Sequence, residues 1–228
     1  MKSSFILTLL AATLAQAHFV FVVPQPGGAS ASVLISETLE PDLAVDAALV
    51  SGAKLSLRGS NGKDVPLVLA KSGSVYAVPI SGSGLRVIHG VKDSGITLDA
   101  DKKPYLLVYH PKTILGDAFD AKATIDGSVP LELVPQGKPG AMAFLVFARG
   151  KPLADAEVTV ILPDGKMKPV KTDKSGRTEV FAMTGRYGAW VRFFETTPGE
   201  REGKKYGEVH HYATLVADVP GAAQASAK

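Results

Sequence analysis

Apolar residues in this chain occur in short stretches separated by clusters of Gly, Pro, Asp and Ser. The stretches are rich in β-branched and aromatic residues and recur at roughly ten-residue spacing, which is typical of β-sandwiches and barrels. Turn pairs such as Asn61-Gly62, Asp164-Gly165 and Ser175-Gly176 favour hairpins, and only Pro41–Leu49 has a helical pattern. The pattern predicts strands at His18–Val23, Ser32–Glu37, Lys54–Arg58, Val65–Leu69, Val75–Pro79, Leu85–Val91, Tyr105–Tyr109, Leu131–Val134, Ala141–Ala148, Glu157–Leu162, Lys168–Thr172, Arg177–Phe181, Gly188–Glu195 and Glu208–Val216.

These elements predict an all-β protein with two domains. A boundary is expected near Asp126–Pro130, where Asp-Gly-Ser precedes a new strand, so residues 18–128 and 129–218 form the two domains. From Gly150 onward, the order of strands and Asp/Gly turns resembles the immunoglobulin-like and carboxypeptidase-regulatory-like β-sandwiches of exported proteins. Residues 219–228 are rich in Ala, Gln and Ser, and we expect a flexible tail there.

The first seventeen residues have the pattern of a secretory signal peptide. Lys2 is followed by the apolar run Phe5–Ala15, and Ala15-Gln16-Ala17 fits the cleavage rule of small residues. The run is shorter than the ~20 apolar residues that span a bilayer, and no later apolar segment reaches that length either. We therefore predict a periplasmic or secreted mature protein without a transmembrane segment, whose first residue is His18.

Composition removes several classes of function. The 228 residues include 25 basic and 22 acidic ones, a net charge of +3 without the basic stripe that nucleic-acid binding needs. The absence of cysteine excludes thiolate sites, so any metal is held by nitrogen and oxygen. No nucleophile elbow, P-loop or dinucleotide turn is present, and we predict that the protein is not an enzyme.

His18 is the strongest candidate for metal binding among the five histidines. Once it is the first residue, its α-amine and its ring Nδ1 can close a chelate ring on one ion. One further histidine would complete a three-nitrogen set suited to Ni(II), Co(II) or Cu(II).

The second candidate region joins Glu195 to the His210-His211 pair. Glu195 ends a strand before a polar loop that returns to the strand of His211, so the two can approach, and Glu195 could ligate the ion or orient the histidine. His210 and His211 point to opposite faces of a strand, so both cannot enter one small site without a bulge. His89 and His110 have no partner at ligand spacing and are predicted to be structural.

Several segments together resemble the DUF4198 family, exported β proteins grouped with periplasmic components of nickel/cobalt uptake systems. They are His18 with the following Phe-Val-Phe-Val-Val-Pro, Gly52–Leu55, Lys103–Leu107, Gly150–Val160, the loop after Glu195, and Lys205–Leu215. The resemblance implies a transition-metal site at His18, Glu195 and His211 and a role in transport. Where many relatives have histidine this chain has Phe193, so His210 is an alternative ligand here.

The leading hypothesis is therefore an exported protein that takes up or handles nickel, cobalt or copper, with a membrane permease component as its partner. A copper enzyme with a histidine brace is one alternative, although the chain has a single tryptophan, Trp190, for the aromatic surface such enzymes use. A structural or adhesive sandwich that binds a protein or glycan is the other.

Overall fold

The computed structural model describes residues 18–125 and 127–221, and the predicted signal peptide lies outside these ranges. The protein is all-β. Within the described residues the helical segments are two single turns of 3-10 helix, η1 (Ala47–Val50) and η2 (Ala121–Ala123). Asp46 and Asp120 cap these turns, each accepting a hydrogen bond from the backbone N–H two residues later.

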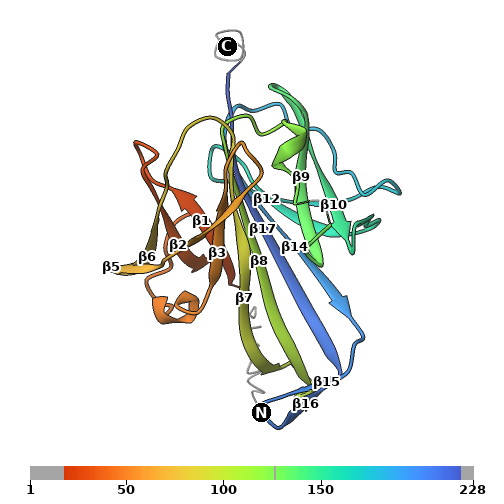
Figure 1. Ribbon diagram of the computed structural model, residues 1–228. Helices are drawn as coiled ribbons and strands as arrows, with labels where there is room; N and C mark the ends of the chain where they lie inside the picture. Colours follow the sequence, from red (N-terminus) through yellow and green to blue (C-terminus); the bar gives the residue numbers. More distant parts are fainter. Residues whose placement is uncertain (1–17, 126, 222–228) are drawn as a thin grey trace, which may run out of the picture.

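A central sheet of eight strands runs through the molecule (Figure 1). Strands β17 and β8 at its centre are parallel, and all other neighbours are antiparallel. The strand order is β13 (Met167–Lys171), β12 (Glu157–Ile161), β14 (Gly185–Glu195), β17 (Glu208–Val219), β8 (Pro104–Leu115), β7 (Arg86–Leu98), β3 (Lys54–Arg58) and β4 (Asp64–Leu67).

Smaller sheets cover the two faces of the central sheet. The first contains β1 (Phe19–Pro24), β2 (Ser30–Ser36), β6 (Val75–Pro79) and β5 (Ala70–Ser72), in that order. The second contains β11 (Lys151–Pro152), β10 (Ala141–Ala148) and β9 (Leu131–Lys138). Figure 1 shows β1 and β2 on one side of the central strands and β9 and β10 on the other. A hairpin of β15 (Gly199–Arg201) and β16 (Lys204–Tyr206) lies between β14 and β17 in sequence.

Alternation along β17 separates the two cores. Ala213 and Leu215 are buried in the core formed with β9 and β10, whereas Tyr212 and Val216 contact the residues of β1. Odd-numbered side chains of β17 therefore face β9 and β10, and even-numbered ones face β1.

Among the described residues, strand β1 pairs with β2 alone, so its outer edge has no strand partner there. Side chains of the central sheet occupy this edge instead, and they donate to every second carbonyl of the segment. The pairs are Tyr109 with His18, Thr214 with Val20, Thr113 with Val22, and Arg186 with Pro24. The start of β1 is thus fixed against β8 and β17.

Several sequence predictions differ from the structure. Pro41–Leu49 contains only the start of η1, and Arg177–Phe181 forms isolated bridges to β10 in place of a strand. Val219, predicted to begin the tail, is the buried last residue of β17. The central sheet takes four strands from each side of the predicted domain boundary. The immunoglobulin-like character of the part from Gly150 onward stays a prediction.

Candidate metal site

His18 lies at the start of β1 with its ring held by a carboxylate. Its Nε2–H donates to Oδ2 of Asp42 at 2.8 Å, and its carbonyl accepts a hydrogen bond from the Tyr109 hydroxyl at 3.1 Å. The other oxygen of Asp42 accepts the backbone N–H of Ala44, which orients the carboxylate. The hydrogen bond from His18 lowers the pKa of Asp42. A proton on Nε2 makes Nδ1 the basic nitrogen of the His18 ring.

His211 lies in a different environment. Its Nε2–H donates to Oε2 of Glu195 at 3.3 Å, and its Nδ1 accepts from Nε2–H of His110 at 3.0 Å. Arg149 binds both oxygens of Glu195, at 3.1 and 2.5 Å. The structure therefore brings Glu195 and His211 together, as the sequence predicts, and both ring nitrogens of His211 are bonded within the protein.

Burial keeps both histidines of this network neutral. It lowers the pKa of His211, and it lowers the pKa of His110 to about 3, with a smaller contribution because His110 and His211 would repel each other if both were protonated. The hydrogen bond from Arg149 lowers the pKa of Glu195. The network is thus a neutral histidine pair that ends on an ionised, arginine-bound carboxylate.

The structure does not bring His18 to His211. The rings of Tyr109 and Tyr212 contact each other on the face that β1 covers, and the Tyr109 hydroxyl binds His18. His211 precedes Tyr212 on the same strand and points to the opposite face. The thickness of the sheet separates the two predicted ligands.

His210, the alternative ligand, lies on the His18 side of the sheet. Its ring is stacked between Tyr105 and Phe194, with centroids 3.8 and 4.1 Å away. Its Nε2–H donates to Oε2 of Glu208 at 2.9 Å. Like His18, it is therefore an imidazole whose Nε2 is held by a carboxylate.

The sequence predicts a structural role for both His89 and His110, but their contacts differ. His89 donates to Asp64, which also binds Arg58, so it has the structural role predicted for it. The sequence predicts a structural role for His110 but no partner, and its bond to His211 depends on the parallel pairing of β8 with β17. No local sequence signal predicts a contact between positions 101 residues apart.

Two further observations concern the possible metal ligands and the helical segments. Within residues 18–125 and 127–221, no three histidine or carboxylate side chains are grouped as metal ligands. A terminal site would use the α-amine of His18 as one of its ligands. None of the helical segments in these ranges is long and apolar enough to cross a membrane.

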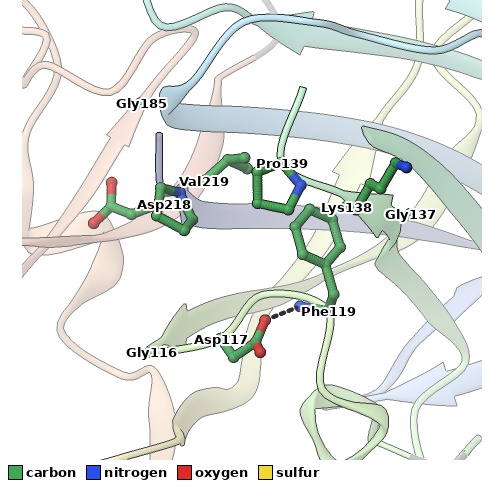
Figure 2. A pocket seen from close by; sticks show the side chains of 10 residues that line it. Gly116, Asp117, Phe119, Gly137, Lys138, Pro139, Gly185, Asp218 and Val219 are labelled. Atoms are coloured by element: carbon green, nitrogen blue, oxygen red, sulfur yellow. Dashed lines mark hydrogen bonds between the residues drawn. The ribbon is translucent and has the colours of Figure 1, made fainter. Parts of the chain in front are cut away.

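A cleft of about 650 Å³ lies at the end of the molecule where β17 finishes. Figure 2 shows the rings of Phe119 and Pro139 in this cleft, with Asp117 and Asp218 at its margin. Asp117 accepts the backbone N–H of Phe119, and Asp218 binds Arg186. Both carboxylates thus hold neighbouring parts of the protein, and no histidine lines the cleft.

Comparisons with known proteins leave the chain without an assigned family. No family model matches the sequence, and no curated protein matches it. A solved structure described as "Structural insight into host cell surface retention of a 1.5-MDa bacterial ice-binding adhesin" is 12% identical to this chain, with a TM-score of 0.21. The match covers 90% of this chain and 66% of that one. A TM-score this low does not support a common fold.

Proposed function

We propose that this protein is an exported carrier of a divalent transition metal, and that the ion binds at the amino terminus formed by cleavage after Ala17. The α-amine and Nδ1 of His18 are the ligands of the terminal chelate. The observation that carries the proposal is the 2.8 Å hydrogen bond between Nε2 of His18 and Asp42.

The chemistry of this pair fits a metal ligand. Histidines that bind metals usually donate their second ring N–H to a carboxylate or carbonyl, which sets the tautomer and raises the basicity of the ligating nitrogen. Asp42 would do this for Nδ1, the ring nitrogen that closes a chelate with the α-amine. The bond from Tyr109 to the carbonyl of His18 holds the backbone of the same residue.

The proposal differs from the ligand set predicted from the sequence. His211 has both nitrogens bonded to His110 and Glu195, so binding an ion would require one of these bonds to break. We therefore assign His211 and Glu195 to a structural network. The cargo is Ni(II), Co(II) or Cu(II), the ions that nitrogen ligands favour.

The resemblance to exported proteins of nickel/cobalt uptake supports a role in delivering the ion to a membrane permease component. Under this proposal the chain is secreted or periplasmic and catalyses no reaction.

The test begins with the intact mass of the mature protein, which establishes whether His18 is the first residue. Isothermal titration with Cu(II), Ni(II) and Co(II) should then give one equivalent of tight binding. A variant with one alanine inserted before His18 keeps the ring but moves the α-amine, so its affinity should fall by several orders of magnitude. An unchanged affinity in that variant would overturn the proposal.

A matched pair of substitutions tests the carboxylate. Asp42→Asn should weaken binding about 10–100-fold, the usual cost of losing a partner that orients a ligand. Asp64→Asn, which alters the equivalent bond to His89 on β7, should leave the affinity unchanged.

A further inference from the structure

The ring of His210 has its Nε2 bound to a carboxylate, whereas its Nδ1 has no bond to a described residue. Nε2 donates to Glu208, and no described residue bonds to Nδ1. His210 is 9% exposed, and Nδ1 is the ring nitrogen left for a further ligand. Nδ1 is therefore the atom through which this histidine could bind a ligand.

Neighbouring rings hold this imidazole in a fixed orientation. Tyr105 on β8 and Phe194 on β14 stack on its two faces, and the carboxylate of Glu208 fixes its tautomer. Phe194, which covers one face of the ring, is itself 52% exposed, so the ring lies one side chain below the protein surface. A fixed ring whose second nitrogen is bound to a carboxylate is the arrangement that metal-binding histidines use.

His210 lies one step along the sheet from His18. In the parallel pair of β17 and β8, Tyr212 is opposite Tyr109 and His210 is opposite Leu107. The carbonyl of His18 binds Tyr109, so His18 lies over the Tyr109–Tyr212 row. The next row on the same face is two residues away, about 7 Å along the strands. β1 begins at Phe19 and runs away from that row.

We propose that His210 is the second imidazole ligand of the ion bound at His18, so that the site has three nitrogens and selects Cu(II). This inference rests on the terminal chelate proposed above. The three donors are the α-amine and Nδ1 of His18 and Nδ1 of His210, with Asp42 and Glu208 as the carboxylates that orient the two rings. Among divalent ions a nitrogen set of this kind binds copper most strongly.

The test uses the mature protein and Cu(II) alone, without any partner. His210→Phe removes both ring nitrogens but keeps an aromatic ring between Tyr105 and Phe194, so the fold should be retained. We expect its Cu(II) affinity to fall at least about 100-fold. The electron paramagnetic resonance spectrum should lose the coupling of one nitrogen.

Three further variants separate the possible results. Glu208→Gln should weaken Cu(II) binding about 10–100-fold. His89→Phe removes a carboxylate-bound histidine on β7, and this variant should bind Cu(II) with the affinity of the unaltered protein. His211→Phe removes the adjacent histidine on the opposite face and should also bind normally, with thermal unfolding as the check that it is folded.

The results for the two proposals are distinguishable. If the alanine insertion before His18 abolishes binding while His210→Phe binds like the unaltered protein, the terminal chelate stands and the role of His210 is wrong. If His211→Phe is folded and loses more Cu(II) affinity than His210→Phe does, the role of His210 is wrong as well. If the insertion has no effect, the terminal chelate itself is wrong.

Discussion

Two adjacent histidines of β17 have opposite environments. His211 points toward β9 and β10, is 4% exposed, and uses both ring nitrogens inside the protein. His210 points to the β1 side, where Glu208 binds one ring nitrogen and no described residue bonds to the other. The difference shows how strand alternation divides neighbouring residues of one type between a structural network and a surface where a ligand can bind.

The two faces also bury polar groups differently. On the β9 side, Lys112 and Glu132 form an ion pair in which both side chains are almost fully buried. On the β1 side, the hydroxyls of Thr113 and Thr214 bind the backbone carbonyls of β1. The first face buries charged groups, and the second buries neutral hydroxyl donors. Substitutions on the two faces should therefore lower the free energy of unfolding by different amounts.

The largest effect should come from Glu132→Ala. The substitution removes the Glu132 carboxylate from the buried ammonium group of Lys112, and it removes the acceptor of the Ile125 N–H. Breaking a buried ion pair in this way costs about 3–5 kcal/mol, which urea unfolding measures. Glu200→Ala, at an exposed position, is the control and should change stability by less than about 0.5 kcal/mol. A loss of similar size in both variants would contradict the role of the pair.

A smaller loss is expected for His110→Phe, which leaves Nδ1 of His211 buried without a donor. The free energy of unfolding at pH 7 should fall by about 1–3 kcal/mol.

The pH dependence of the same variant tests the charge state of the network. Because burial lowers the pKa of His110 to about 3, the unfolded chain binds more protons than the folded protein between that pH and 6.5. Stability therefore falls as the pH drops from 6.5 toward 3. Removing His110 should reduce this slope by up to about 1.4 kcal/mol per pH unit, measured by urea unfolding at several pH values. An unchanged slope would show that His110 is not held neutral.

On the β1 face, Thr214→Val should cost about 0.5–1.5 kcal/mol, because the carbonyl of Val20 loses its donor while the side-chain volume is kept. Thr197→Val in the exposed loop after β14 is the matched control. If Thr214→Val and Thr197→Val lower the free energy of unfolding equally, the hydroxyl of Thr214 does not stabilise the edge of β1.

The smallest effect should come from Arg149→Ala. The Arg149 side chain is 56% exposed, so its pair with Glu195 contributes at most about 1 kcal/mol to stability, and added salt should reduce this contribution further. A larger loss that salt does not reduce would place Arg149 in the buried network.

Much of the fold could be predicted from local patterns. The strands around His18–Val23, Ala141–Ala148 and Glu208–Val216 are present because their residues favour extended structure and alternate between two faces. Arg177–Phe181 is also predicted as a strand. It forms two isolated bridges to β10, at Phe181 with Met142 and at Arg177 with Leu145, and no continuous ladder. Composition alone does not determine whether a partner strand is available.

The candidate site was predictable only in part. The approach of Glu195 to His211 follows from adjacent antiparallel strands, which sequence order makes probable. The bond from His110 to His211 requires β8 and β17 to pair in parallel across 101 residues of sequence. No short-range pattern contains that information.

The sequence alone determined the all-β class, the donor atoms available for a metal, and the rule that His210 and His211 face opposite ways, because these depend on residue types and on the geometry of a single strand. The tertiary structure decided which of the two lies on the side of His18. That choice depends on which face of the central sheet β1 packs against, through contacts of Tyr109, Thr113 and Thr214 that are remote from β1 in sequence.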